Sequence, residues 1–451
     1  MKKVTIIGSG LAGCLLALYL ARRDYEIWMY ESRPDLRRDS IDRGRSINLA
    51  LSCRGMTGLI GVGIEAEVSK IMVPMRARAI HHEDGEINYQ PFGRHKDEHI
   101  NAILRVDLNK LLLDQLEKYP KVHLHFNTRL IACDFDQQTL QFEQPDGMMV
   151  NKNYEQLVAA DGASSVVREL LLHKQHIQSS REYLAHGYKE LSIYQGKDKQ
   201  FEREHLHLWP RDSHLLLGNP NRDGSITGSL FLANTGKDSF EELDNEIRIH
   251  NFFKKSFKDA VPAMPYLVEE FLNNPTGKMS TICTFPWNYK HSCLLIGDAA
   301  HGVVPFFGQG MNSAFEDCRV LNELLVTHQD DWHTIAPLFY QVRKPNTDAV
   351  AQMSLDNYHE IQTDIRQTAF NFKKQLEWAL MKQYPDRYVS KHVLVMFTNT
   401  PYAQAYAIGE LQLTLLDTIA RKYKTLETVH WEEVAIFMQA YDKKLAQLLG
   451  A

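Results

Sequence analysis

The chain has 451 residues, which is enough for two or three domains and a sizeable hydrophobic core. Hydrophobic residues make up 44% and charged residues 24%, as is ordinary for a folded globular protein. The formal net charge of −5 and the lack of a long basic run argue against a nucleic-acid partner, and no apolar stretch reaches the roughly 18 residues of a membrane span.

The beginning of the chain and its cysteines indicate where the protein works. The run VTIIG near the first residue is too short for the apolar part of a signal peptide, and no cleavage-site pattern follows it. The six cysteines show no CxxC spacing, so we expect free thiols rather than disulfides or a zinc site. These features predict a cytoplasmic protein.

The first predicted elements are a strand, a helix and a second strand within residues 3–31. VTII has the continuous apolar character of a buried strand, a helical pattern runs from Leu11 to Arg23, and EIWMY predicts the next strand. This order is typical of a Rossmann-type nucleotide-binding unit.

Three glycines in GxGxxG spacing join the first strand to the helix. Gly8 permits the tight turn, Gly10 lets the backbone approach a pyrophosphate, and Gly13 lets the helix pack on the strand. The anion would sit at the helix N-terminus, and Glu31, 23 residues after Gly8, can accept hydrogen bonds from a ribose. The motif predicts a dinucleotide site without choosing between NAD and FAD, and a glycine turn that binds no nucleotide is the alternative.

The middle of the chain contains a helix, a strand with an acidic end and a strand-rich stretch. VDLNKLLLDQL predicts a helix, and YEQLVAADGASSVVRELL (154–171) predicts a strand ending at Asp161-Gly162 before another helix. EHLHLWP, SHLLLGNP and SITGSLFLA, with the turn PNRDG, predict an antiparallel sheet. The HLHF and HLHLW histidine pairs have a spacing that can bind metal, but we assign them to ordinary strand positions and predict no metal site.

A strand, CLLIGD, and the segment PFFGQGMN follow within residues 293–312. The strand ends at Gly297-Asp298, Pro305 opens an apolar corner, and Gly310 begins a helix; alone, this would be a plain loop leading into a helix. From about residue 331, runs such as QTAFNFKKQLEWALMKQY and AIGELQLTLLDTIARKY have helical spacing. The last run, EEVAIFMQAYDKKLAQLL, predicts a helix packed on its own domain or, alternatively, on a membrane surface or a partner.

At the glycine fingerprint, the Asp161-Gly162 piece and the Gly297-Asp298 piece, the sequence resembles the class A flavoprotein aromatic hydroxylases. The resemblance implies an α/β fold with a Rossmann-like FAD-binding domain, an antiparallel β-sheet substrate domain and a C-terminal helical region. The expected extents are residues 1–75, 100–180 and 285–330 for the FAD-binding domain, 76–99 and 181–284 for the substrate-binding sheet domain, and 331–451 for the helical region.

The resemblance also implies that these three pieces line one extended FAD molecule. Asp298 would bond the ribityl hydroxyls, and the segment from Pro305 to Gly310 would pass the isoalloxazine. The helix that follows would point its N-terminus at the pyrimidine ring, where the dipole stabilises negative charge. The residues assigned to FAD by the fingerprint and the resemblance are Gly8, Gly10, Leu11, Ala12, Gly13, Tyr30, Glu31, Ser32, Arg33, Ala50, Arg105, Leu130, Asp161, Val166, Asp298, Pro305, Gly310, Met311 and Asn312.

Further segments narrow the resemblance to family members that act on an aromatic amino acid. It assigns substrate contacts to Arg78, Phe92, Asn357 and His392, with Arg78 as a bidentate clamp for the carboxylate. Phe92 and His392 stand where the family has tyrosines, and Tyr402 is the alternative match for the second. Without the resemblance, Arg78 would be read as a surface salt bridge. The segments are RGRSINLALS (43–52), MRARAIH (75–81), HGYKELSI (186–193), HLWPR (207–211) and VPFFGQGMNSAFEDC (304–318).

The implied reaction leaves the difficult chemistry to the flavin, so we predict no catalytic residue. In the family, NADPH reduces FAD, O₂ adds at C4a, and the C4a-hydroperoxyflavin transfers an electrophilic OH to the aromatic ring. Two alternatives stay open. One is an FAD hydroxylase for another aromatic acid, which the altered pocket residues allow, and the other is a non-enzymatic FAD-binding interaction protein.

Overall fold

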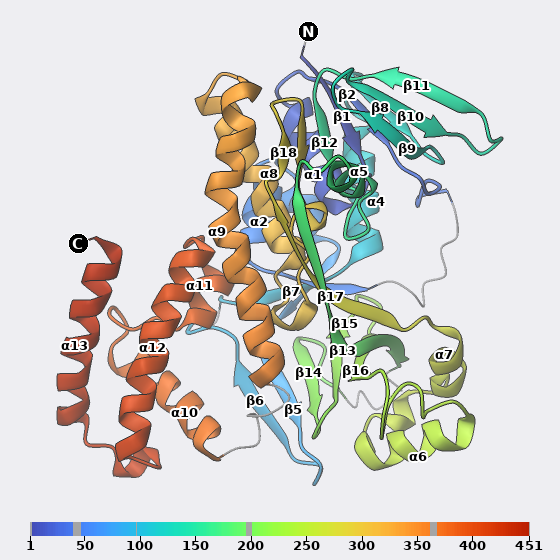
Figure 1. The fold of residues 1–451 in the computed structure, drawn as a ribbon. Helices are drawn as coiled ribbons and strands as arrows, with labels where there is room; N and C mark the ends of the chain where they lie inside the picture. Colours follow the sequence, from blue (N-terminus) through green and yellow to red (C-terminus); the bar gives the residue numbers. More distant parts are fainter. Residues whose placement is uncertain (1, 39–46, 96, 195–200, 361–367, 451) are drawn as a thin grey trace.

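The computed structural model describes residues 2–38, 47–95, 97–194, 201–360 and 368–450. The first four residues of the RGRSINLALS segment lie outside them. Within the described residues, the strands form a six-stranded, a seven-stranded and two three-stranded sheets. Figure 1 shows the six-stranded sheet at the top, the seven-stranded sheet below it and helices α10–α13 at the left. The predicted fold class is confirmed, whereas the residue boundaries of the domains stay a prediction.

The six-stranded sheet is the predicted nucleotide-binding unit. Its strand order is β18-β19-β12-β1-β2-β8, and its pairs are parallel except at the edge strand β18. Because β1 lies inside this sheet with both faces covered, the VTII run is apolar almost throughout. The strands are β1 (Lys3–Ile7), β2 (Glu26–Tyr30), β8 (Val122–His125), β12 (Leu157–Ala159), β18 (Asn288–Tyr289) and β19 (Cys293–Leu295).

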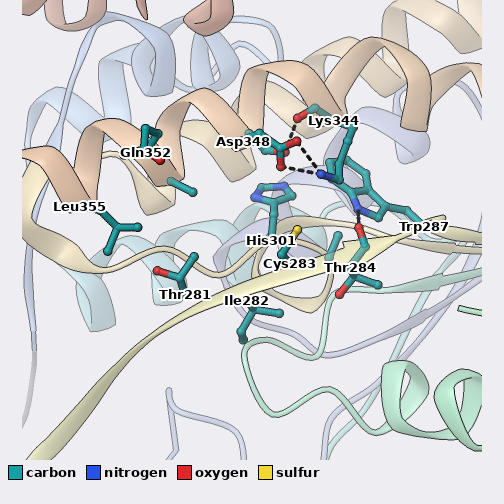
Figure 2. A pocket seen from close by; sticks show the side chains of 13 residues that line it. Thr281, Ile282, Cys283, Thr284, Trp287, His301, Lys344, Asp348, Gln352 and Leu355 are labelled. Atoms are coloured by element: carbon teal, nitrogen blue, oxygen red, sulfur yellow. Dashed lines mark hydrogen bonds and ion pairs between the residues drawn. The ribbon is translucent and has the colours of Figure 1, made fainter. Parts of the chain in front are cut away.

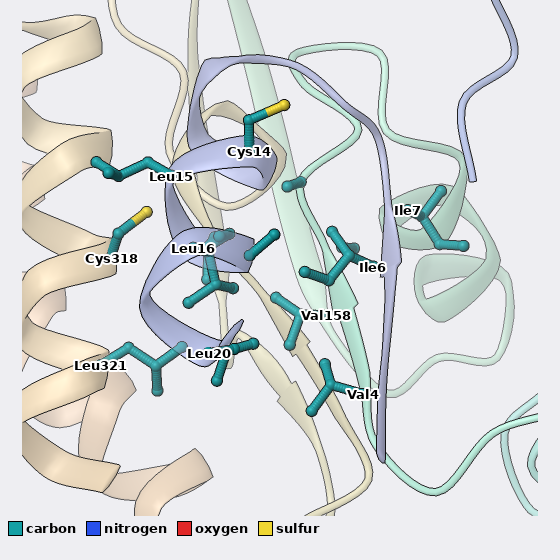
Figure 3. Packing of buried hydrophobic residues seen from close by; sticks show 14 of the residues in the cluster. Val4, Ile6, Ile7, Cys14, Leu15, Leu16, Leu20, Val158, Cys318 and Leu321 are labelled. Carbon is teal, nitrogen blue, oxygen red and sulfur yellow. The ribbon is translucent and has the colours of Figure 1, made fainter. Parts of the chain in front are cut away.

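Helices from distant parts of the chain cover this sheet. The first, α1 (Leu11–Ala21), ends earlier than the predicted Arg23, because Asp24 takes a positive φ of 64° and turns the chain into β2. Figure 3 shows Ile6 of β1 and Leu20 of α1 packed with Leu321 of α8 in one buried cluster. The other helices of this part are α2 (Cys53–Ile60), α3 (Glu65–Ser69), α4 (Arg105–Leu116), α5 (Val166–His173) and α8 (Gly310–Thr327).

Two small antiparallel sheets lie beside this unit. One small sheet has the order β3-β7-β4 and the other β11-β10-β9. All six cysteines are free thiols, as predicted from their spacing. The strands are β3 (Asn48–Leu51), β4 (Met72–Met75), β7 (Ile100–Leu104), β9 (Arg129–Asp134), β10 (Thr139–Glu143) and β11 (Met149–Asn153).

The seven-stranded sheet has the order β17-β13-β16-β15-β14-β5-β6. It was predicted to be antiparallel, but β5 pairs with β14 in parallel. These two strands are far apart in sequence and no hairpin joins them, so no tight turn forces them to be antiparallel. One face packs on α6 and α7 in a separate apolar cluster. The elements are β5 (Ala77–His81), β6 (Ile87–Pro91), β13 (Gln178–Ile193), β14 (His205–Pro210), β15 (Leu215–Pro220), β16 (Ile226–Ala233), β17 (Gly277–Phe285), α6 (Glu246–Ser256) and α7 (Leu267–Asn273).

The C-terminal part is helical where it is described, as predicted. Its last helix buries Val434, Met438 and Tyr441 in a cluster shared with α10 and α12, so this helix packs on its own domain. No helix within the described residues has both the length and the apolar character needed to cross a membrane. The helices are α9 (Trp332–His359), α10 (Thr368–Gln383), α11 (Lys391–Phe397), α12 (Tyr402–Lys422) and α13 (Trp431–Leu449).

Candidate active site

A cavity of about 2190 Å³ lies between the two large sheets and the C-terminal helices. It includes the carboxyl ends of β1, β12 and β19, where ligands bind in open parallel sheets. A drug-sized ligand fills at most about 1,000 Å³, so this space admits an extended cofactor and a substrate together. The sequence-assigned cofactor residues that line it are Gly10, Leu11, Ala12, Ala50, Arg105, Asp298, Pro305, Gly310 and Met311.

A second cavity, shown in Figure 2, is too small for this role. It encloses about 100 Å³ beside Trp287 and His301, under the surface ion pair of Lys344 and Asp348. Such a volume holds a few water molecules and no cofactor.

The glycine fingerprint has the geometry that a pyrophosphate cradle needs. Gly8 has a positive φ of 98°, and a Cβ there would lie 2.5 Å from the Ala160 carbonyl oxygen. A Cβ on Gly13 would lie 2.1 Å from the Gly8 oxygen, so this glycine allows the helix to touch the turn. A Cβ on Gly10 would meet nothing within 4 Å, so its backbone borders open space. These three environments fit the roles predicted from the spacing.

Glu31 lies buried at the end of β2 and is tied to the turn. Its carboxylate accepts hydrogen bonds from the Ser9 backbone N–H at 2.9 Å and from Arg33 Nε at 2.9 Å. Burial alone would raise its pKa, but Arg33 and the Ser9 N–H outweigh burial and lower the pKa to about 2. The carboxylate therefore stays ionised, and it also accepts hydrogen bonds from the Ser9 and Ser32 hydroxyls and from the Arg33 N–H.

The Asp161-Gly162 and Gly297-Asp298 pieces are held together by Arg168. Its guanidinium donates to the carbonyl oxygens of Ala163 at 2.6 Å and Ala299 at 3.1 Å. The Asp161 carboxylate accepts from the Val166 N–H at 2.8 Å, so it stabilises the start of α5. The sequence did not reveal this role of Arg168, because its partners are main-chain oxygens and one of them, that of Ala299, lies in a distant segment.

Asp298 is an acidic group that follows β19 and faces the cavity. Its side chain is exposed to the cavity, and no hydrogen bond to its carboxylate is found in the part of the chain that the structure describes. The surrounding protein desolvates the carboxylate and raises its pKa. An acceptor without a protein partner suits the hydroxyls of a ribityl chain.

We therefore expect Asp298→Ala to weaken FAD retention by about tenfold or more, because a hydrogen bond to a charged group is worth roughly 1.5–3 kcal/mol. The dissociation constant can be measured by titrating the apoprotein with FAD and following flavin fluorescence. Asp348→Ala, which removes an exposed carboxylate paired with Lys344, is the control. Unchanged FAD affinity in Asp298→Ala would remove this residue from the site.

The N-terminus of α8 borders the cavity through Gly310 and Met311. Asn312 was assigned to the flavin, but its side chain is buried and already satisfied. Its Nδ2 donates to the oxygens of Ala50 at 2.8 Å and Gly308 at 2.9 Å, and its Oδ1 accepts from the Ser52 N–H at 2.9 Å. Only the main chain of Asn312 is left for a cofactor, and its side chain fixes α8 against β3.

The other assigned residues lie outside the lining of the cavity. Tyr30 is buried and stacks on Phe142, with ring centroids 4.1 Å apart, and Leu130 is buried in the same core cluster. Val166 is exposed at the start of α5. The assigned residues that do not line the cavity are Gly8, Gly13, Tyr30, Glu31, Ser32, Arg33, Leu130, Asp161, Val166 and Asn312.

The four residues assigned to the substrate all line the far end of the cavity. The Arg78 guanidinium lies over the Phe92 ring, 4.7 Å from its centroid, and its Nη2 donates to His392 Nε2 at 3.3 Å. Burial lowers the pKa of Arg78 to about 10, which still leaves it cationic. Burial and the nearby Arg78 charge hold the pKa of His392 well below its usual value, so its imidazole is neutral. Asn357 donates to the Phe306 carbonyl oxygen.

His392 and Tyr402, the two candidates for the second tyrosine position, lie in different surroundings. His392 lies on α11 beside Arg78, whereas Tyr402 is fully buried at the start of α12. The Tyr402 hydroxyl donates to Gln309 Oε1 at 2.7 Å, and its ring stacks under the Arg54 guanidinium. Tyr402 is therefore part of the core, and His392 occupies the position at the cavity.

A buried ionic network beneath Asp298 was not predicted. The Asp317 carboxylate accepts from Arg343 Nε at 2.7 Å, from His301 Nε2 at 2.5 Å and from the Gly297 N–H at 3.0 Å. Burial alone would raise the pKa of Asp317, but His301 and Arg343 lower it. The network fixes the Gly297-Asp298 turn, and no local pattern marks Arg343 as its member.

Comparisons with known proteins agree with this geometry. Residues 1–213 and 257–333 match the FAD binding domain family. The crystal structure of Pseudomonas aeruginosa PqsL in complex with 2-aminobenzoylacetate has a TM-score of 0.66 at 19% identity, covering 80% of this chain and 97% of that one. Klebsiella pneumoniae HpxO, complexed with FAD and uric acid, has a TM-score of 0.66 at 16% identity, covering 85% and 92%. These structures share the fold.

Relatives of higher sequence identity indicate the family to which the chain belongs. The kynurenine 3-monooxygenase of Legionella pneumophila strain Corby is 60% identical over 449 residues, covering 100% of both chains. That of Myxococcus xanthus is 40% identical over 442 residues, covering 96% of this chain and 94% of the other. The family match and these relatives show that the chain is an FAD-dependent aromatic monooxygenase. Within that class, the chain belongs to the kynurenine 3-monooxygenase family.

Proposed function

We propose that this protein binds FAD non-covalently in the large cavity and hydroxylates L-kynurenine to 3-hydroxykynurenine with NADPH and O₂. The proposal rests on one observation: a single cavity has an end suited to the cofactor and an end suited to the substrate. One end has the glycine cradle and the free Asp298 carboxylate, and the other has the cationic Arg78 beside an apolar sheet face. When bound, FAD supplies the redox chemistry and the activation of oxygen.

The residues of this chain bind and orient the two molecules. Gly10 and the start of α8 are placed to hold the cofactor, and Asp298 to accept from its sugar chain. Arg78 is placed to hold the substrate carboxylate through its planar fork. Because the ring amine of kynurenine already activates the adjacent carbon, no base is needed, and we assign none. The apolar side chains of the sheet that exclude water from the ring are Leu206, Leu208, Leu215, Leu217 and Phe231.

The test is NADPH consumption by the purified yellow protein with kynurenine, together with identification of the product by mass. We expect acid or heat to release intact FAD, and kynurenine to accelerate NADPH oxidation with a product one oxygen atom heavier. A protein that holds NAD or FMN instead, or that oxidises NADPH at the same rate with and without kynurenine, would contradict the proposal.

A hydroxylase for another aromatic acid is the second candidate, and Phe92 favours it. Phe92 offers no hydroxyl to the cavity, whereas the tyrosine expected there would donate a hydrogen bond to the substrate. A panel of aromatic acids tested by oxygen uptake separates the two candidates. NADPH oxidation with none of them would favour a non-enzymatic FAD-binding protein.

We also propose a cytoplasmic location, which the six free thiols support.

A further inference from the structure

Two opposite charges face the substrate end of the cavity without pairing. Arg78 contacts His392 and Phe92, and among the described residues its guanidinium forms no ion pair with a carboxylate. Glu377 of α10 lines the same cavity, and among the described residues its carboxylate forms no hydrogen bond or ion pair. Unpaired charges inside a protein are costly unless a ligand neutralises them.

The two charges lie on neighbouring parts of the cavity wall. Leu376 of α10, next to Glu377, shares a buried cluster with Val393 of α11, and the adjacent His392 contacts Arg78. Burial lowers the pKa of Arg78, and Glu377 is the first of the two carboxylates that counteract this shift. A guanidinium and a carboxylate that line one cavity without pairing suit a zwitterion, which presents a carboxylate to one and an ammonium to the other.

Among the other acids that line the cavity, Glu360 and Glu190 are less suited to this role. The Glu360 Oε2 atom lies 3.7 Å from Lys374 Nζ, so Glu360 already has a cation beside it. Glu190 lies on β13, which is separated from β5 and Arg78 by β16, β15 and β14. Four strand spacings of about 4.8 Å place Glu190 about 19 Å away, beyond the reach of one small substrate held by Arg78.

We propose that Glu377 binds the α-ammonium group of the substrate while Arg78 binds its carboxylate, so that the enzyme selects α-amino acids over simple aromatic acids. This inference rests on the proposed function. It assigns the selection to a helix of the C-terminal part, outside the match to the FAD binding domain family. A substrate that lacks the amine would leave Glu377 unneutralised and would bring a second negative charge near it.

The experiment compares L-kynurenine with its deaminated analogue, 4-(2-aminophenyl)-4-oxobutanoate. Dissociation constants for both are measured on the FAD-loaded protein from the change in flavin fluorescence, and turnover is followed in parallel. We expect the wild type to prefer kynurenine by about tenfold or more, because a charge-assisted hydrogen bond is at stake. Glu377→Gln should bring this ratio close to one. Glu410→Gln, which removes an exposed carboxylate of α12, should leave it unchanged.

The outcomes separate this inference from the proposed function. A ratio measured within one variant does not depend on how much of that variant is folded, so a loss of stability cannot imitate the result. If the wild type hydroxylates kynurenine and Glu377→Gln keeps the full preference, the inference is wrong and the proposed function stands. If Glu360→Gln abolishes the preference instead, the ammonium lies at Glu360 and the assignment to Glu377 is overturned. A wild type that neither binds nor hydroxylates kynurenine overturns both.

Discussion

Replacing Arg78 by alanine should raise KM for kynurenine by about tenfold or more, because a lost charge-assisted pair costs on the order of 1.5–3 kcal/mol. The guanidinium is held in place by the Phe92 face and by His392, so it is already oriented toward the cavity. Phe92 cannot donate a hydrogen bond, which leaves more of the substrate's orientation to Arg78. The ring would then align poorly, and NADPH would be consumed without hydroxylated product, with the oxygen appearing as H₂O₂.

The measurements are KM and the ratio of hydroxylated product to NADPH consumed. Arg78→Lys should rescue poorly, since one ammonium cannot reproduce the planar fork. The neighbouring Arg76 supplies the control, because it is exposed and paired with Glu204, with 2.7 Å between Arg76 Nε and Glu204 Oε2. Arg76→Ala should keep wild-type values. Wild-type KM and coupling in Arg78→Ala would show that this arginine does not hold the substrate.

Arg343→Met should lower the free energy of unfolding by about 3–5 kcal/mol, because it leaves buried carboxylates without their cation. Arg343 is fully buried, and it pairs with Asp317 at 2.7 Å and with Glu316 at 3.1 Å. Asp317 also holds the Gly297 N–H and His301, so we expect weaker FAD retention in the same variant.

The comparison is a urea titration of the apoproteins followed by tryptophan fluorescence. Arg248→Met is the matched control, since Arg248 and its partner Asp244 on the surface are both exposed and such surface pairs contribute about 0–1 kcal/mol. A loss below 1 kcal/mol in Arg343→Met would mean that the network relaxes around the missing charge, and that Asp317 does not depend on it.

At the substrate end of the cavity, the sequence predicted most of the residues but left one position open. Arg78, Phe92, Asn357 and His392 were assigned through resemblance to a family, and the structure places all four on one cavity. Which residue would occupy the second tyrosine position stayed open in the sequence, because His392 and Tyr402 are only ten residues apart. In the tertiary structure His392 lines the cavity, whereas Tyr402 is buried against Gln309.

At the cofactor end, the sequence predicted the helix start at Gly310 but not the role of the Asn312 side chain. Asn312 follows the glycines that open α8, which favoured a flavin contact, but its side chain joins α8 to β3. Whether a polar side chain faces a ligand or the protein depends on partners such as Ala50 and Ser52, which lie more than 200 residues away in the chain. The sequence did not predict the parallel pairing of β5 and β14 for a similar reason. The alternation of apolar and polar residues within a strand does not show which strand lies beside it.

The sequence by itself determined the unit from β1 to β2, with its glycine turn and its acidic end. The contacts that join β1, the glycine turn and β2 are made within about 30 consecutive residues, so spacing is sufficient to specify them. The tertiary structure alone decided the shared cavity, the Arg343 network and the unpaired charges of Arg78 and Glu377. These depend on side chains from distant segments meeting in space, and the free energy of such contacts comes from burial and charge that no local pattern records.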